Sequence, residues 1–235
     1  MFDKIRLSQN AYFEFGTILC AFPKIAYLCY YLNSGTRPFL VRKHTDLVIE
    51  GFPRSATTFS YYAFCMAQRR RVHVAFHLHS PVNVVNALRM KVPVLVILRP
   101  PRDAVSSAFV RDPQISLKAN LRRYDAFYRL LTPYKNDIVV ADFKDVVRDF
   151  GQFVERINKK FDKNYLRPTN HPLDLEKIRD GLVLRNQHGT QLTSYLPNDE
   201  KENLKRQVDF RSCRTELRRC EDLYHQWIHS GPGSL

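Results

Sequence analysis

The stretch from Leu47 to Phe59 constrains the fold of this chain more than any other. It reads Leu-Val-Ile-Glu-Gly-Phe-Pro-Arg-Ser-Ala-Thr-Thr-Phe. Its apolar start predicts a buried strand, Gly51 and Pro53 predict a turn, and residues 59–66 predict a helix. A tight loop between a strand and a helix directs backbone N–H groups and the positive end of the helix dipole to one point. Together with the charge of Arg54, this pattern predicts a binding site for a phosphate-type anion.

Strand-like and helix-like segments alternate along the chain from Asp46 onward. We expect strands at residues 46–50, 72–77, 93–98 and 137–141. We expect helices at residues 58–70, 82–91, 103–110, 115–132 and 144–160. Such alternation predicts an α/β fold of three layers, with a central parallel sheet flanked by helices. Ligands of such sheets bind beyond the carboxyl ends of the strands. The candidate ligand-binding residues of this chain, such as Arg54 and Arg99, fall at these ends.

The 235 residues are expected to form a single domain. Its predicted parts are a helical N-terminal extension (1–44), an α/β core (45–160), a helical C-terminal part (161–230) and a disordered tail (231–235). In the C-terminal part, helices are predicted within residues 173–184, 196–209 and 211–229.

Residues 11–32 are the most apolar part of the chain, and they predict two short helices broken near Pro23. Glu14, Pro23 and Lys24 interrupt the segment, which therefore lacks the roughly 20 apolar residues of a spanning helix. The N-terminus shows no small-residue cleavage site, which argues against a signal peptide. Shallow association with a membrane through residues 11–32 is an alternative interpretation.

The chain is strongly basic, with 37 Lys and Arg against 23 Asp and Glu and a formal net charge of +14. This charge favours a polyanionic ligand, nucleic acid or an anionic membrane surface. No RRM, KH or helix-turn-helix signature is present, so we expect no nucleic-acid partner. The five cysteines include no C-x-x-C pair, which favours reduced thiols in a cytoplasmic protein over a disulfide scaffold.

Residues 51–58 nearly match the nucleotide loop G-x-x-x-x-G-K-[ST], which predicts a P-loop-like nucleotide-binding architecture. Ala56 stands at the second glycine and Thr57 at the lysine. That lysine reaches the β- and γ-phosphates in NTPases, so its replacement argues against ATP or GTP hydrolysis. Asp142, just after the last predicted strand, is a loose candidate for the acidic magnesium ligand. A P-loop kinase or NTPase therefore stays an alternative.

A second anion site is predicted at residues 94–107. A buried strand ends at Arg99, two prolines turn the chain, and Asp103 can cap a helix that carries Ser107. Arg99 and Ser107 can converge on one anion, although an ordinary capped helix beside a surface arginine gives the same pattern. Two anion sites on neighbouring strand ends suit a ligand with phosphates at both ends.

These two stretches together resemble the sulfotransferase family. Residues 53–59 resemble its 5′-phosphosulfate loop, P-K-S-G-T-T-W, and residues 99–107 resemble its 3′-phosphate motif, R-x-P-x-D-x-x-x-S. The resemblance implies a donor, 3′-phosphoadenosine 5′-phosphosulfate (PAPS), and no metal. It also implies in-line transfer of a sulfuryl group to a hydroxyl or amine, with release of 3′,5′-adenosine bisphosphate.

The resemblance also implies roles for individual residues. Arg54 stands for the family lysine near the bridging oxygen, and Phe59 for a tryptophan that stacks on adenine. The residues implied to hold the 5′-phosphate are Ser55, Ala56, Thr57 and Thr58. Arg99 and Ser107 would hold the 3′-phosphate. Residues 184–189 loosely resemble a late arginine-containing loop, which makes Arg185 a candidate for the same phosphate or else a solvated arginine.

Two departures from the family pattern have chemical consequences. Arg54 stays charged and cannot release a proton as a lysine can. Ala56 tolerates a positive φ poorly, so the loop there must adopt a negative φ or carry strain. A PAPS-binding protein with impaired catalysis is therefore a further alternative.

The family uses a histidine followed two residues later by proline as general base, and His79-Ser-Pro81 fits this pattern. His77 is the second candidate. Unperturbed histidine titrates near ~6.5, which suits proton removal from an alcohol. If residues 72–79 are fully extended, His73, His77 and His79 share a face. A zinc site or structural roles for these histidines are the competing interpretations.

The acceptor stays open between two chemical classes. Apolar side chains in residues 11–32 would suit a lipid, phenol or steroid-like alcohol. The excess of basic charge would equally suit an anionic glycan.

Overall fold

The computed structural model describes residues 16–169, 172–185 and 199–229. Its centre is a sheet of four parallel strands in the order β2-β1-β3-β4. The strands are β1 (Leu47–Gly51), β2 (Val74–Phe76), β3 (Val94–Leu98) and β4 (Val139–Asp142). All four predicted strands are confirmed, and their ends differ from the prediction by no more than two residues.

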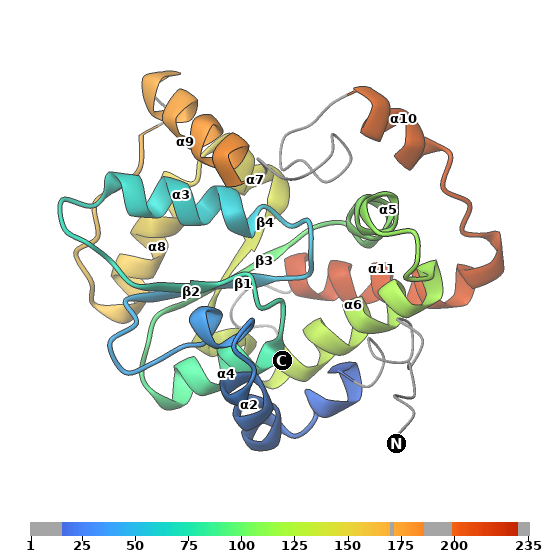
Figure 1. The fold of residues 1–235 in the computed structure, drawn as a ribbon, viewed down its shortest axis with the longest axis horizontal. Helices are drawn as coiled ribbons and strands as arrows, with labels where there is room; N and C mark the ends of the chain where they lie inside the picture. Colours follow the sequence, from blue (N-terminus) through green and yellow to red (C-terminus); the bar gives the residue numbers. More distant parts are fainter. Residues whose placement is uncertain (1–15, 170–171, 186–198, 230–235) are drawn as a thin grey trace, which may run out of the picture.

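Side chains of the central strands alternate between two cores. Val94, Val96 and Leu98 of β3 point to the core formed with helices α4 (Pro81–Arg89), α6 (Leu117–Leu131) and α11 (Arg214–His229). Leu95 and Ile97 point to the opposite core, formed with α3 (Thr57–Ala67), α8 (Gly151–Phe161) and α9 (Pro172–Arg185). Figure 1 shows α3 and α9 on one side of the sheet and α4 and α6 on the other. The predicted three-layer α/β fold is therefore confirmed.

The helix predicted at residues 144–160 is two helices, α7 (Phe143–Arg148) and α8. Asp149 separates them, because its Oδ1 accepts the N–H of Gly151 at 3.0 Å while its Oδ2 pairs with Arg167 at 2.7 Å. A Cβ atom on Gly151 would lie 2.6 Å from Arg167 Nε. The arginine thus crosses the start of α8, where only glycine leaves room.

The other helices follow the prediction. They are α2 (Pro23–Leu32), α5 (Pro101–Arg111) and α10 (Asp199–Arg206). Residues 16–19 are also helical, so the break near Pro23 is confirmed. Within the described residues, no helix has the length and apolar character needed to cross a membrane. The tail 231–235 lies outside the described residues.

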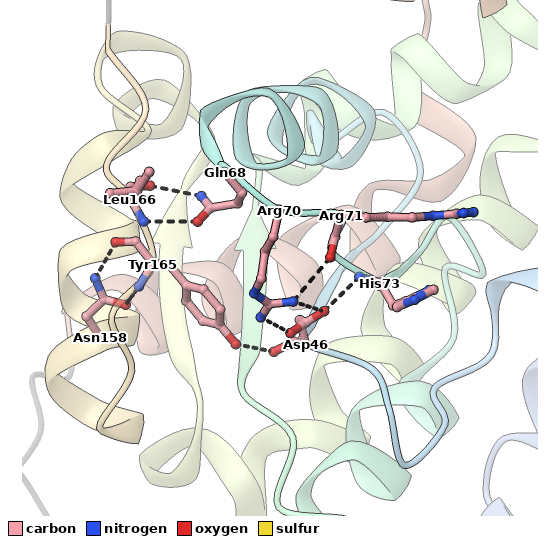
Figure 2. A network of polar contacts seen from close by, with 8 residues as sticks. All are labelled: Asp46, Gln68, Arg70, Arg71, His73, Asn158, Tyr165 and Leu166. Atoms are coloured by element: carbon pink, nitrogen blue, oxygen red, sulfur yellow. Dashed lines mark hydrogen bonds and ion pairs between the residues drawn. The ribbon is translucent and has the colours of Figure 1, made fainter.

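A polar cluster joins the amino end of the sheet to the chain that follows α8 (Figure 2). Asp46 accepts the backbone N–H of His73 at 2.8 Å and pairs with the Arg70 guanidinium. The Tyr165 hydroxyl donates to the Asp46 carbonyl at 2.6 Å. Leu166 exchanges two hydrogen bonds with the Gln68 side chain, both at 3.0 Å. These contacts hold the chain together at the amino ends of the strands, opposite the carboxyl ends where the anion sites are predicted.

Candidate functional site

A cleft of about 410 Å³ opens at the carboxyl ends of β1 and β3. It lies between the loop after β1, the first turns of α3, helix α5 and helix α10. Predicted site residues on its lining are Arg54, Ala56, Thr57, Thr58, Phe59, His77, His79, Arg99 and Ser107. Ser55 is buried within the loop itself. Arg185 ends α9, its side chain is outside the described part, and so are residues 186–189 of its loop.

The loop between β1 and α3 adopts an uncommon backbone conformation. Arg54 and Ala56 have φ angles of 71° and 62°, in the left-handed region. For residues other than glycine this region costs roughly 1–2 kcal/mol. Of the two outcomes predicted for Ala56, the structure shows the strained one. Thr57 and Thr58 then begin α3 as buried residues on the wall of the cleft.

The two predicted anion sites are joined by direct hydrogen bonds. Arg99 Nη1 donates to the Arg54 carbonyl at 2.7 Å, and Arg54 Nε donates to Ser107 Oγ at 3.1 Å. The Arg99 guanidinium also lies over the ring of Phe143, 4.3 Å from its centroid. The parallel sheet thus brings together motifs that are 45 residues apart in the sequence.

Ser55 Oγ and Arg99 Nε are buried polar atoms that lack a hydrogen-bond partner among the described residues. The Tyr128 hydroxyl is close enough to interact with Ser55, but the two are not in hydrogen-bond geometry. A buried polar atom without a partner is destabilising by about 1–3 kcal/mol. A ligand rich in oxygen acceptors would satisfy both donors, so the donor chemistry of the loop fits a phosphate or sulfate.

Basic residues outside the two predicted anion motifs add positive charge to the cleft. Arg111 of α5 and Lys201 and Lys205 of α10 also line it, beside one acidic residue, Glu202. Lys201 is buried, with 5% of its surface exposed. Burial, followed by the charges of Arg54 and Lys205, lowers the pKa of Lys201 to about 8. Sequence reasoning missed these residues, whose one hint was the spacing of two lysines on one helix face.

A hydrogen bond to β1 fixes the tautomer of His79. Its Nδ1 atom lies 2.8 Å from the carbonyl oxygen of Gly51. A carbonyl oxygen can only accept, so Nδ1 carries a proton, and in the neutral ring Nε2 then keeps the lone pair. Burial lowers the pKa of His79 well below its ordinary value, with further contributions from His77 and Arg123. His79 is therefore a neutral proton acceptor at physiological pH.

Glu50, in the middle of the apolar strand β1, was not among the predicted site residues. It is fully buried, and burial raises its pKa to about 8. Its Oε2 accepts the backbone N–H of His79 at 2.9 Å, and its Oε1 accepts Asn83 Nδ2 at 2.9 Å. A lone acid inside the run Leu-Val-Ile-Glu-Gly was the sequence signal that could have identified it.

The histidines do not share one extended face. Strand β2 ends at Phe76, and His77 and His79 have φ angles of 71° and 52°. Residues 72–79 are therefore not fully extended, and the condition under which the three histidines would share a face is not met. His77 and His79 lie together, with ring centroids 5.0 Å apart, while His73 packs against His44 at the opposite end of the strand. Among the residues that the structure describes, no three His, Cys, Asp or Glu side chains gather as metal ligands.

Asp142, the loose candidate for an acidic magnesium ligand, is engaged elsewhere. Its Oδ1 accepts the N–H of Lys144 at 2.8 Å as the N-cap of α7. Its Oδ2 accepts the hydroxyl of Tyr224. The side chain does not line the cleft. Asp142 is therefore not placed to hold a magnesium ion in this cleft.

Comparison with known proteins found likenesses among solved structures alone. No protein-family model matches the chain, and no curated protein matches it either. Among solved structures, the chain is similar to the crystal structure of mouse sulfotransferase SULT7A1 complexed with PAP, with 12% sequence identity and a TM-score of 0.44. The match covers 83% of this chain and 88% of that one. A likeness at this level assigns neither a substrate nor a mechanism to this chain.

Proposed function

We propose that this protein is a PAPS-dependent sulfotransferase, which moves a sulfuryl group to a hydroxyl or amine acceptor and releases 3′,5′-adenosine bisphosphate. The observation that carries the proposal is the junction of the two motifs in one cleft. Arg54, Arg99 and Ser107 form a continuous hydrogen-bonded set there. A ligand with phosphates at both ends can engage both motifs at once.

Each part of the cleft has a role in this proposal. The residues that would hold the 5′-phosphosulfate are Arg54, Ser55, Ala56, Thr57 and Thr58, with the N-terminus of α3 behind them. Arg99 and Ser107 would hold the 3′-phosphate, and Phe59 would lie against the adenine. Lys201 and Lys205 of α10 add cations that can close over the phosphates. Arg185 stays a candidate for the same phosphate.

The acid–base chemistry would fall to His79. Its Nε2 lone pair can take the proton from the acceptor oxygen as that oxygen attacks the sulfur in line. PAPS supplies the activated sulfuryl group when bound. The fixed positive charges of Arg54 and the N–H groups of α3 would stabilise negative charge on the leaving phosphate. His77, whose ring centroid is 5.0 Å from that of His79, is the second candidate for the base.

A PAPS-binding protein with impaired catalysis is the second candidate function. The strained backbone at Ala56 and the arginine at position 54 favour it, because both alter the loop around the transferred group. Binding and turnover measured on one preparation separate the two functions. Tight binding of 3′,5′-adenosine bisphosphate with no consumption of PAPS would assign the impaired form.

We also propose a cytoplasmic setting. The five cysteines form no disulfide, which suits a reducing compartment. Quantitative labelling of all five thiols in protein isolated without reductant would support this proposal. An intermolecular disulfide in the freshly isolated protein would contradict it.

The deciding experiment compares three ligands by thermal shift: 3′,5′-adenosine bisphosphate, Mg-ATP and a DNA oligomer. The bisphosphate is expected to raise the melting temperature by several degrees when its concentration is 100 times the dissociation constant, because binding then adds about 2.7 kcal/mol. Mg-ATP is expected to have a smaller effect. Stabilisation by Mg-ATP with none by the bisphosphate would replace the proposal with a nucleotide-triphosphate function.

A further inference from the structure

A second cavity, of about 330 Å³, lies on the other side of His79. It is enclosed by residues around α2, the start of α4 and helix α6. Its apolar lining includes Leu19, Leu78, Phe127 and Leu130, and its polar lining includes Tyr30 and Arg123. A volume above about 300 Å³ and a mainly apolar wall with few polar groups are typical of small-molecule sites.

His79 is the link between the two cavities. His79 is a lining residue of both the cationic cleft and this second cavity. Since Nδ1 is held by the Gly51 carbonyl, the ring cannot turn without losing that hydrogen bond. The residue proposed above as general base thus lies where the two cavities meet, as transfer between a donor and an acceptor requires.

Arg123 brings a positive charge to the same place. Its Nη2 donates to the His79 carbonyl at 3.2 Å, and its charge also acts on Tyr30 and Glu50. A cation beside an attacking hydroxyl favours the deprotonated oxygen, which is the nucleophilic form.

We propose that the second cavity binds the acceptor, and that the acceptor is an uncharged, largely apolar phenol or alcohol whose hydroxyl lies between His79 and Arg123. This inference rests on the proposed sulfotransferase function. In the step it serves, a bond forms between the acceptor oxygen and sulfur while the bond from sulfur to the donor's phosphate oxygen breaks. The acceptor proton passes to Nε2 of His79, and the released electron pair stays on the phosphate. The apolar wall selects against the anionic glycan that the net charge also allowed.

The test measures binding by calorimetry, with 2-naphthol as the apolar probe and a sulfated heparin disaccharide as the glycan probe. Ala126→Trp fills the cavity from α6, and Lys118→Trp places the same side chain on the exposed part of that helix. We expect 2-naphthol to bind the wild type and Lys118→Trp alike and to lose at least tenfold affinity in Ala126→Trp. The affinity for 3′,5′-adenosine bisphosphate should be the same in all three proteins, which also shows that they are folded.

Three results would overturn the inference: no binding of 2-naphthol, unchanged binding in Ala126→Trp, or preference for the disaccharide. Failure of the donor function looks different. In that case the bisphosphate does not bind the wild type, while 2-naphthol still distinguishes the two tryptophan variants.

A second inference concerns the outer surface of the same N-terminal region. Five apolar side chains there are each more than half exposed, at 56–74%: Ile18, Phe22, Ile25, Leu28 and Leu32. The spacing of the last four places them on one side of α2, which Figure 1 shows on the outside of the α4 layer. No described residue covers this apolar stripe.

The charge around the apolar stripe points to its partner. Residues 16–45 contain Lys24, Arg37, Arg42 and Lys43, and they contain no Asp or Glu. An apolar helix face flanked by basic residues is suited to the interface of an anionic membrane. We infer that the apolar stripe docks on an anionic phospholipid surface.

Co-sedimentation with vesicles tests this docking. Vesicles of phosphatidylcholine with phosphatidylserine should bind the wild type several-fold better than phosphatidylcholine alone, and less at high salt. Ile25→Asp and Leu28→Asp should abolish binding, whereas Met66→Asp, an exposed apolar position on α3, should retain it. Equal sedimentation of wild type and Ile25→Asp, or none of either, would overturn the inference. A dimer that Ile25→Asp dissociates would assign the stripe to a second copy of the chain instead.

Discussion

The backbone N–H of His79 donates to Glu50 Oε2 at 2.9 Å, so a buried carboxyl of the central strand fixes the segment that carries the proposed base. The next residue of the same strand, Gly51, accepts the Nδ1 proton of the histidine ring. Two consecutive residues of β1 thereby set both the position and the tautomer of His79. Orientation of a histidine by a hydrogen bond to its second nitrogen is a recurring requirement for acid–base function.

Replacing Glu50 should change how stability depends on pH. Its pKa is raised to about 8, so the folded state holds a proton that the unfolded chain releases near its ordinary value. Stability should therefore fall as pH rises from about 5 to 8, by up to about 1.4 kcal/mol per pH unit. In Glu50→Gln this part of the dependence should vanish. Chemical denaturation at several pH values checks it, and parallel stability curves for the two proteins would contradict the raised pKa.

Removing the two histidines should have unequal effects on turnover. We expect His79→Ala to lower kcat about 10²–10⁴-fold, the usual contribution of a general base. His77→Ala should lower it much less, because His77 would act only through its contact with His79. A PAPS-consumption assay measures both, with the affinity for 3′,5′-adenosine bisphosphate as the control for folding. Full activity in His79→Ala would show that His79 is not the general base.

The low pKa of His79 predicts an unusual pH profile. A base with its ordinary pKa would lose activity as pH falls through ~6.5. Because burial and nearby positive charge lower the pKa of His79, kcat/KM should stay level from pH 7 to pH 6. Arg123→Met should move the loss of activity to higher pH, and Arg123→Lys should restore the original profile. A decline of the wild-type kcat/KM near pH 6.5 would contradict the lowered pKa of His79.

Relieving the strain at Ala56 should stabilise the protein. Its φ of 62° is accessible to glycine without a steric cost, although glycine gains more freedom in the unfolded chain. We expect Ala56→Gly to add about 0.5–1 kcal/mol to the free energy of unfolding. Ala63→Gly, in the middle of α3, is the matched control and should lower it by about 1 kcal/mol or more. Destabilisation by both substitutions would mean that the Ala56 methyl group contributes packing that outweighs the strain.

Lys201 is expected to lower the stability of the ligand-free protein and to raise its affinity for the ligand. The buried ammonium lies near Arg54 and Lys205, and its pKa is lowered to about 8. Its charge is therefore unfavourable in the ligand-free protein, and stability should rise with pH between about 8 and 10.5. Lys201→Met should raise the melting temperature and weaken binding of 3′,5′-adenosine bisphosphate about tenfold or more. Lys91→Met, a lysine outside the cleft, is the control. If Lys201→Met binds the bisphosphate as tightly as the wild type, Lys201 does not contribute to the binding site.

The sheet and the anion loops could be predicted because their sequence patterns are local and strong. The runs before Gly51 and Arg99 are continuously apolar, which identifies buried parallel strands. The rule that ligands bind at the carboxyl ends of such strands then predicts that Arg54, Arg99 and Ser107 lie close together. The hydrogen bond between Arg54 and Ser107 is the structural outcome of that rule.

The parts that could not be predicted depend on tertiary contacts. Lys201 reaches the cleft because α10 packs on α5, about 90 residues away in sequence. The break between α7 and α8 at Asp149 depends on Arg167, which lies in the segment after α8 and pairs with the Asp149 carboxylate. The turn at His77 replaces an expected extended segment, and hydrogen bonds to Glu50 and Gly51 hold the chain just after it. None of these partners lies within the window over which helical or strand periodicity is read.

Gly51 has a consequence for how such a site can change during evolution. A Cβ atom there would lie 2.5 Å from the Ile97 carbonyl of the neighbouring strand, so any side chain would push β1 and β3 apart. The same residue supplies the carbonyl that selects the tautomer of His79. A side chain at position 51 that displaced β1 would therefore also shift the acceptor of the histidine proton. Acceptor preference can diverge through the cavity walls, while position 51 has almost no freedom to vary.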